Sequence, residues 1–142
     1  MSGQRVLVDT GAIYAFVTRT DPNHDAAKKF VESWLEKRGL FVLADVVFAE
    51  TMTLLKARLG TQIALRVGRE LRRNPAYSWI CLGEAGERDT WATFQRHEDK
   101  AWSYTDCAIL TLALRERVLQ VFAFDHHFSQ MPELRRLPEL DA

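Results

Sequence analysis

The sequence lacks closely spaced cysteines, long apolar runs and a signal-peptide pattern, which are features of zinc-binding, disulfide-rich, membrane and secreted proteins. Its two cysteines, Cys81 and Cys107, lie far apart and form no Cys-x-x-Cys pair, which argues against a structural zinc site and a disulfide framework. We expect both to be small buried residues in a reducing compartment. No apolar run approaches the roughly 18 residues that span a bilayer, and no signal-peptide pattern is present. A cytoplasmic protein without a membrane segment is therefore expected.

An excess of charge of either sign is also lacking. The 19 basic and 19 acidic residues give a formal net charge of zero, so the net charge does not indicate a nucleic-acid partner. It does not exclude a local basic face. Apolar residues make up 47% of the chain and charged residues 27%, the balance of a globular protein. The 142 residues suggest one domain, over residues 1–142.

Short apolar runs alternate with segments of helical periodicity. Strands are expected at 5–9, 40–44, 78–82 and 121–124. Helices are expected at about 11–18, 23–39, 45–59, 61–73, 84–97 and 103–117, with Asp45 as a possible cap of the third, and the tail after Pro132 is short and polar. Strands joined by helical crossovers predict an α/β fold with a mostly parallel sheet, whose ligands bind beyond the carboxyl ends of the strands.

Four acidic residues stand where acids are usually avoided. Asp9 and Asp125 each end an apolar strand. Glu50 lies in "FAETMTLL", where helical spacing predicts that it faces the core. Asp106, in "WSYTDCAILTLAL", is expected to face the same side as the apolar residues three and four positions later.

Each acid except Glu50 also has a purely structural interpretation. Asp9, with Thr10, could cap the first helix, and Asp125 could begin a turn. Ser103-x-x-Asp106 fits a capping box, in which the acid folds back onto the cap amide. Glu50 lies a turn into its helix, beyond any capping position. A thermal melt of Asp106→Asn in EDTA is expected to separate the two interpretations. If the acids cluster, the substitution should raise the melting temperature; if Asp106 is only a cap, the melting temperature should stay the same or fall slightly.

A divalent cation explains the four acids together. Buried carboxylates cost several kcal/mol unless they are paired, and clustered ones repel. Carboxylate donors without a thiolate pair favour Mg²⁺ or Mn²⁺ over zinc. Such an ion can hold phosphate oxygens and activate water, so the expected reaction class is metal-assisted phosphodiester hydrolysis.

The chain resembles PIN-domain ribonucleases, and specifically VapC-type toxins of toxin–antitoxin pairs. The matching stretches are "VLVDTGAIYAF", "DPNHDAA", "FAETMTLL", "WSYTDCAI" and "FAFDHHF", in order along essentially the whole chain. The resemblance implies a three-layer α/β/α sandwich around a central parallel sheet of four to five strands, with the first and fourth strands adjacent at its centre.

The resemblance also implies roles for single residues. Asp9, Asp106 and Asp125 would hold the metal, and Glu50 would help to bind it and to deprotonate the attacking water. The supporting hydroxyl residues would be Thr10, Ser103 and Thr105. Some relatives carry a further acid after the fourth, where this chain has His126 and His127. These could be ligands or a base, but a turn histidine without a spaced partner is more typical of neither.

The partners implied are an RNA substrate, such as a tRNA or another structured RNA cut in an exposed loop, a cognate antitoxin, and a second copy of the chain in a homodimer. For each basic side chain that could guide RNA, a solvated helix face is the preferred interpretation; these side chains are Arg19, Arg58, Arg66, Arg69, Arg72, Arg73, Arg115 and Arg117. Most tryptophans are expected in the core. The aromatic residues of the first two helices, Tyr14, Phe16, Phe30 and Trp34, are a possible docking face.

Two other functions remain open from the sequence. One is a PIN-like module that binds RNA or protein without cutting, against which the intact set of acids argues. The other is a phosphatase or phospho-acceptor domain on a doubly wound sheet. Gly11 stands where an Asp-x-Asp phosphatase would have its second aspartate, which argues against that reading.

Overall fold

A five-stranded parallel sheet forms the centre of the molecule. The structure, a computed structural model, describes residues 3–140, so both ends of the expected domain 1–142 lie outside the described residues. The strand order is β3-β2-β1-β4-β5 and every neighbouring pair is parallel. The strands are β1 (Arg5–Val8), β2 (Leu40–Ala44), β3 (Tyr77–Ile80), β4 (Gln120–Phe122) and β5 (Arg135–Leu137).

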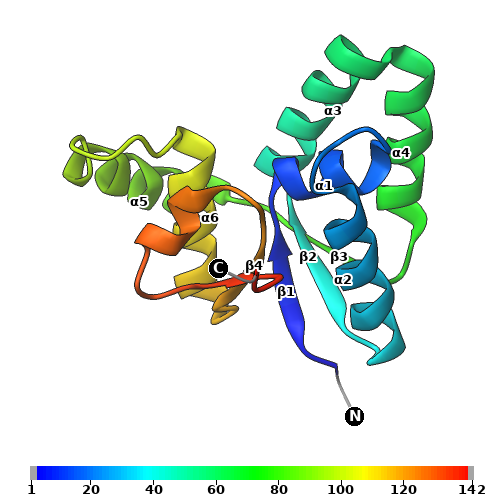
Figure 1. Ribbon diagram of the computed structural model, residues 1–142. Helices are drawn as coiled ribbons and strands as arrows, with labels where there is room; N and C mark the ends of the chain where they lie inside the picture. The colour runs from blue at the N-terminus through cyan, green and yellow to red at the C-terminus, as the bar shows by residue number, and fades with distance from the viewer. Residues whose placement is uncertain (1–2, 141–142) are drawn as a thin grey trace.

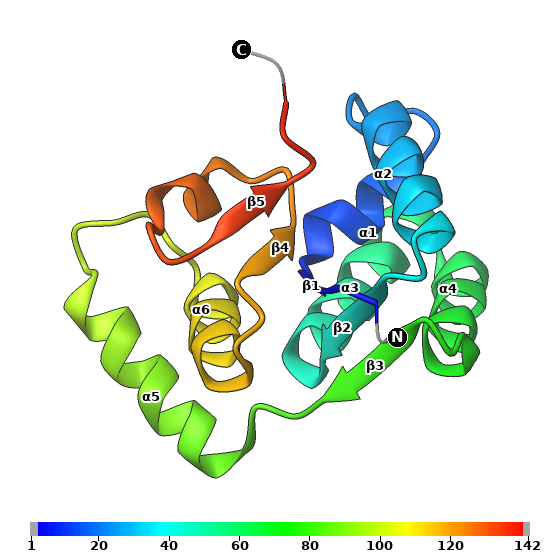
Figure 2. The same cartoon turned by 90° about the horizontal axis from the view of Figure 1, so that it is seen from below.

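Helices cover both faces of this sheet. They are α1 (Thr10–Val17), α2 (His24–Glu36), α3 (Asp45–Leu59), α4 (Thr61–Arg73), α5 (Gly83–Arg96) and α6 (Tyr104–Glu116), with a short 3₁₀ helix, η1 (His126–Gln130). Viewed from below, α1, α2 and α4 lie on one side of the strands, and α6 backed by α5 lies on the other (Figure 2). The predicted three-layer α/β/α sandwich with β1 and β4 adjacent is therefore confirmed.

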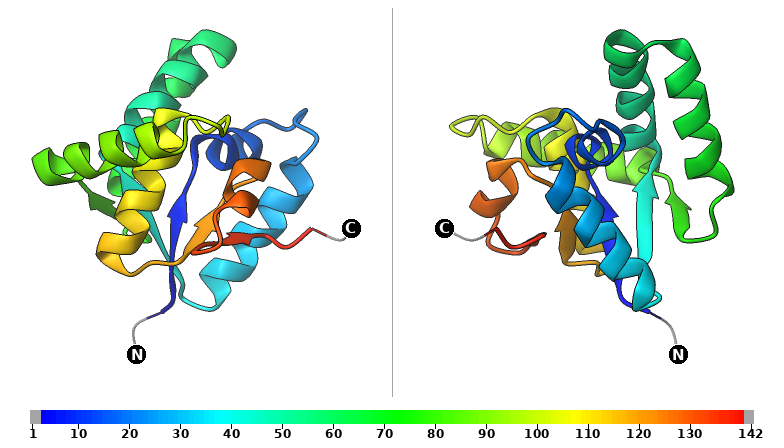
Figure 3. Two further views of the ribbon diagram at one scale, coloured as in Figure 1. Left: turned by 90° about the vertical axis from the view of Figure 1, so that its left-hand side faces the viewer. Right: turned by 45° about the vertical axis from the view of Figure 1, so that its right-hand side comes forward.

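The pair α3 and α4 extends past the sheet. The two helices run antiparallel, and α3 rises beyond the carboxyl ends of the strands (Figures 1 and 3). Only one stripe of α3 is fully buried, formed by Val47, Thr51 and Leu55, four residues apart. The amino-terminal part of α3 thus stands beside the edge of the sheet where ligands bind in such folds.

The core lies on both sides of the sheet. Phe41 of β2 and Phe122 of β4 project to one face, where Phe122 packs against Phe30 of α2, and both are at most 2% exposed. Ile109 and Leu112 of α6 are fully buried against the opposite face. Continuous apolar strands without alternation are what a parallel sheet covered on both faces requires, and this is the pattern that made the strands recognisable.

Several local predictions were wrong. The polar tail contains β5, which pairs with β4 through Gln120 and Arg135, although no apolar run marks it. Asp45 is the first residue of α3 and not its cap; its Oδ1 accepts a hydrogen bond from the backbone N–H of Leu82 at 3.0 Å. Cys81 is exposed, while Cys107 is buried as expected.

The tryptophans divide evenly between core and surface. Trp34 and Trp102 are each 6% exposed, whereas Trp79 and Trp91 are 41% and 53% exposed. The expectation that most would be core holds for half of them. Across residues 3–140, none of the helices combines the length and the apolar character needed to cross a membrane.

Candidate active site and metal centre

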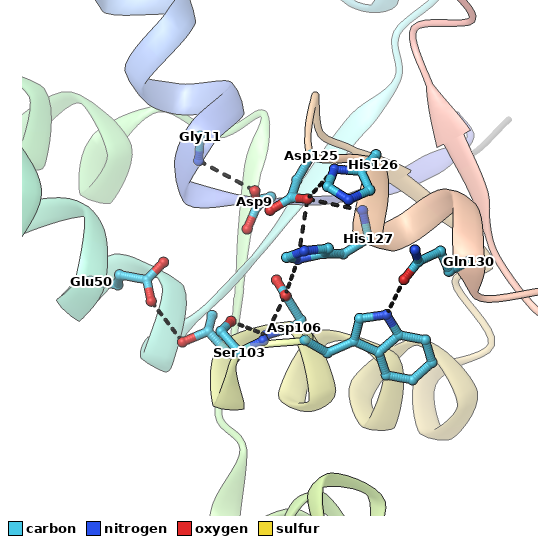
Figure 4. Close-up of polar contacts among 11 residues, drawn as sticks. Asp9, Gly11, Glu50, Ser103, Asp106, Asp125, His126, His127 and Gln130 are labelled. Atoms are coloured by element: carbon cyan, nitrogen blue, oxygen red, sulfur yellow. Dashed lines mark hydrogen bonds and ion pairs between the residues drawn. The ribbon is translucent and has the colours of Figure 1, made fainter. Parts of the chain in front are cut away.

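The carboxyl ends of β1 and β4 place two of the four acids side by side. Val8 is paired with Phe122 in the sheet, and the backbone N–H of Asp9 donates to the carbonyl of Phe122 at 3.0 Å. Asp125 follows three residues after the end of β4. Glu50 on α3 and Asp106 on α6 approach from the flanks (Figure 4). All four predicted acids therefore lie at one edge of the sheet.

Asp9 caps α1 and is buried at the floor of this site. Its Oδ2 accepts a hydrogen bond from the backbone N–H of Gly11 at 3.3 Å, and the residue is only 7% exposed. Burial, followed by the negative charges of Asp106 and Glu50, raises the pKa of Asp9 from 3.8 to about 7. The cap and the acid cluster predicted for Asp9 are therefore both present in one side chain.

Asp106 combines the capping box with the cluster as well. Its Oδ2 accepts from the backbone N–H of Ser103 at 2.8 Å, and its own backbone N–H donates to Ser103 Oγ at 3.0 Å. The same Oδ2 accepts from His127 Nδ1 at 2.9 Å. Because both interpretations hold together, the melting temperature of Asp106→Asn does not distinguish them.

Glu50 is exposed, so the prediction that it faces the core was wrong. It lies next to the narrow stripe that α3 buries, in the second turn of the helix. Its Oε2 accepts a hydrogen bond from the hydroxyl of Thr105 at 2.8 Å. This contact joins α3 to the first turn of α6 and turns the carboxylate toward the other acids (Figure 4).

Asp125 lies between solvent and the two histidines. Its side chain is 37% exposed, and its Oδ1 accepts from the backbone N–H of His127 at 2.9 Å. Among residues 3–140, Asp125, His126 and His127 form the group whose possible ligand atoms all lie within 4.8 Å of one another.

The three supporting hydroxyl residues have different partners. Thr10 turns its hydroxyl toward α3, where it accepts a hydrogen bond from Thr51 at 3.3 Å. Ser103 holds Asp106 through its backbone N–H, while its hydroxyl accepts from the backbone of Asp106. Thr105 holds Glu50, not the aspartate beside it. The sequence named His127 as a possible ligand or base, but no motif spacing reveals its contacts with Asp106 and Asp125.

The donor set fits a hard divalent cation. In the described part of the chain, hydrogen bonds reach one oxygen of each carboxylate, namely Oδ2 of Asp9 and Asp106, Oδ1 of Asp125 and Oε2 of Glu50. The second oxygen of each remains available, and the four carboxylates point into a common space (Figure 4). Monodentate carboxylates with room for water are the ligands Mg²⁺ prefers, and Mn²⁺ accepts the same donors.

Three of the predicted RNA-guiding arginines have other contacts, and one of them, Arg58, lies over the ring of Tyr14 at 5.3 Å. Arg115 donates to the carbonyls of Leu82 and Cys81 at 2.7 and 2.8 Å, which fixes the start of α5. Arg72 lies over the rings of Phe48 and Trp79. These arginine side chains therefore contact other parts of the fold. That the remaining predicted arginines guide RNA stays a prediction.

The first two helices border an apolar groove that faces α4. The groove has a volume of about 420 Å³, and the side chains that line it include Phe16, Val31, Leu35, Val67 and Leu71. Of the four aromatic residues predicted for a docking face, Phe16 lines this groove, while Phe30 and Trp34 pack against the core.

Comparison with known proteins agrees with this geometry. The family model described as "PIN domain" matches residues 6–134. A 23S rRNA-specific endonuclease, VapC20 of Mycobacterium tuberculosis, is 25% identical over 134 residues, covering 94% of this chain and 99% of the relative.

Solved structures show the same fold. The crystal structure of M. tuberculosis VapC20, described as a sarcin–ricin loop cleaving toxin, matches with a TM-score of 0.81 at 24% identity, covering 89% of this chain and 95% of that one. VapBC2 from Rickettsia felis, bound to a DNA fragment from its promoter, matches with a TM-score of 0.71 at 10% identity, covering 94% and 97%.

Proposed function

Since the chain belongs to the PIN-domain family, we propose that it is a divalent-metal-dependent endoribonuclease that acts as the toxin of a toxin–antitoxin pair. The observation that carries this proposal is the set of four acids at the carboxyl edge of the sheet. Burial and its acidic neighbours raise the pKa of Asp9 to about 7, which describes a site built for a cation. Phosphodiester hydrolysis is the chemistry that such an ion supports.

Each acid has a role that follows from its position. Asp9 and Asp106 are buried and fixed by backbone N–H groups, so they are suited to be the main ligands of Mg²⁺ or Mn²⁺. Asp125, half-exposed, completes the site. When bound, the ion would neutralise charge on the phosphate and lower the pKa of a water. Glu50, exposed and oriented by Thr105, would receive a proton from the attacking water.

The proposed substrate is an exposed loop of a structured RNA. A recessed acidic site reaches a phosphate only where the backbone is not paired in a helix. The relative VapC20 is named for 23S rRNA and for the sarcin–ricin loop, so a hairpin carrying that loop is the first substrate to test, with a tRNA as the second. Such a toxin would act in the cytoplasm, where these RNAs are used.

The apolar groove bordered by α1, α2 and α4 is the proposed place for the antitoxin. The similar structures include a toxin–antitoxin complex from Klebsiella pneumoniae and DNA-bound VapBC from Salmonella typhimurium. An amphipathic segment could bury its apolar side against Phe16, Val31 and Leu71, with Arg66 and Glu70 at the rim. Substituting Val67→Arg should abolish binding of the protein encoded by the adjacent reading frame. The homodimer stays a prediction, which analytical ultracentrifugation tests.

The test of the proposed activity is cleavage of the loop RNA with Mg²⁺ or Mn²⁺. The wild-type protein should cut it, whereas the addition of EDTA or the substitution Asp9→Asn should abolish the cut. Cleavage that survives both controls contradicts the proposal. RNA binding without cleavage under any metal condition favours the alternative, a catalytically inactive PIN-like module.

A further inference from the structure

His127 contacts two of the four acids at once. Its ring Nδ1 donates a hydrogen bond to Asp106 Oδ2 at 2.9 Å and lies 3.2 Å from Asp125 Oδ1. Its backbone N–H donates to the same oxygen of Asp125 at 2.9 Å. The side chain is only 17% exposed. One residue thus joins a carboxylate of α6 to a carboxylate that follows β4.

The ring faces the oxygens that are already occupied. Asp106 Oδ2 also accepts from Ser103, so this oxygen is held from two sides. The hydrogen bonds of His127 and Ser103 reach Oδ2 of Asp106 and Oδ1 of Asp125, so among the described residues Oδ1 of Asp106 and Oδ2 of Asp125 stay available to a cation. A ring nitrogen between two carboxylate acceptors must carry a hydrogen, so Nδ1 is a donor here and has no lone pair for a metal.

We propose that His127 is a positioning residue. Its Nδ1–H holds Asp106 and Asp125 at a fixed separation, so that each presents one oxygen to the same cation, and the ring itself does not bind the ion. The inference deepens the proposed function and rests on it. Residues that orient metal ligands in this way commonly contribute about 10- to 100-fold to metal affinity.

The local structure keeps the ring in this place. Phe128, the next residue, is fully buried and anchors η1 in the core. At the end of η1, Gln130 accepts a hydrogen bond from Trp102 Nε1 at 2.8 Å, which ties η1 to the segment before α6. The imidazole is therefore held by the fold on both sides and does not depend on a bound ion for its orientation.

The test compares Mn²⁺ binding of three variants by calorimetry. Asn places its amide nitrogen two bonds from Cβ, where Nδ1 stands, whereas Gln places it one bond farther, where Nε2 stands. His127→Asn should bind Mn²⁺ almost as the wild type does, and His127→Gln about 10- to 100-fold more weakly. The control is His126→Asn: its side chain is 78% exposed, and its Nδ1 lies 3.7 Å from Asp125 Oδ1, beyond hydrogen-bond distance. It should bind like the wild type.

Spin-echo spectroscopy of the bound Mn²⁺ supplies a second readout. The wild-type spectrum should show no coupling to a directly bound imidazole nitrogen. Such a coupling, lost in both His127 variants, would make His127 a ligand and overturn the inference. Equal affinity of His127→Gln and the wild type, equal loss in the Asn and Gln variants, or tighter binding by His127→Gln would also overturn it.

The outcomes separate this inference from the proposed function. Cleavage of RNA by a wild type whose affinity for Mn²⁺ does not change in His127→Gln contradicts the positioning role alone. The expected Asn–Gln difference without any RNA cleavage supports the positioning role and contradicts the nuclease. A wild-type protein that does not bind Mn²⁺ contradicts both.

Discussion

At the scale of the single residue, Asp9 serves two purposes with two different oxygens. Oδ2 caps α1 through Gly11, and the second oxygen points into the acidic site. Sequence reasoning presented the cap and the ligand as alternatives because a one-dimensional pattern does not distinguish the oxygens of a carboxylate. In Asp106 a single oxygen, Oδ2, accepts both the hydrogen bond of the capping box and that of His127.

The raised pKa of Asp9 predicts how stability depends on pH. Its pKa is 3.8 in the unfolded chain and about 7 in the fold, so the folded state holds the proton more tightly. Without metal, the free energy of unfolding should therefore fall as the pH rises from about 4 to about 7, by at most roughly 4 kcal/mol from this group. Above pH 7 the ionised carboxylate of Asp9 destabilises the fold by this full amount.

Asp9→Asn should remove this part of the pH dependence, because the amide keeps an acceptor for Gly11 and carries no charge. In EDTA, the variant should be more stable than the wild type at pH 8, and the difference should shrink toward pH 4. Denaturant unfolding across this range measures it. If the free energies of unfolding of the two proteins change in parallel with pH, burial and repulsion do not raise the pKa of Asp9, and the prediction is wrong.

The hydroxyl of Thr105 should matter for catalysis and little for stability. Thr105→Val removes the donor that orients Glu50 and should lower kcat about 10-fold or more. Because the contact is exposed, the stability cost should stay near 1 kcal/mol. Thr105→Ser keeps the hydroxyl and should retain activity; a serine variant as impaired as the valine variant would contradict this role.

At the scale of the element, the periodic and continuous apolar patterns were sufficient for six helices and four strands. In two elements these patterns did not predict the structure correctly. The strand β5 carries arginines at positions 135 and 136 and is recognisable only through its pairing with β4. The helix α3 leaves the sheet, so Glu50 on its apolar-looking side meets solvent. The existence of β5 and the exposure of Glu50 both depend on the position of the element in the tertiary structure, which no local sequence pattern encodes.

The turn between α2 and β2 provides a stability test. A Cβ on Gly39 would overlap the indole ring of Trp34, whose Nε1 donates to the carbonyl of Leu40 at 3.1 Å. Gly39→Ala should therefore destabilise the fold by about 1–3 kcal/mol, as overpacking does.

Gly11→Ala is the matched control, because its Cβ would meet only Asp9 Oδ2 at an ordinary 3.5 Å, inside α1. Helix propensity then favours alanine by up to about 1 kcal/mol. Thermal melts of both variants check the pair. A Gly39→Ala protein as stable as the wild type would mean that Trp34 can move without losing its packing.

At the scale of the whole molecule, a chain of zero net charge places four of its 19 acidic residues together at one edge of the sheet. The order of the strands brings Asp9 and Asp125 together across more than 100 residues of sequence, and helices from opposite sides add Glu50 and Asp106. The resemblance in sequence anticipated this convergence. It did not anticipate the hydrogen bonds of His127, because these depend on the path of the chain after β4.

The most direct test of the central claim is the anomalous diffraction of a crystal soaked with Mn²⁺. The account predicts a peak within bonding distance of the second oxygens of Asp9, Asp106 and Asp125, with Glu50 beside it and His127 Nδ1 still on Asp106. A peak bound by His126 and His127 instead, or none near Asp9 and Asp106, would contradict it.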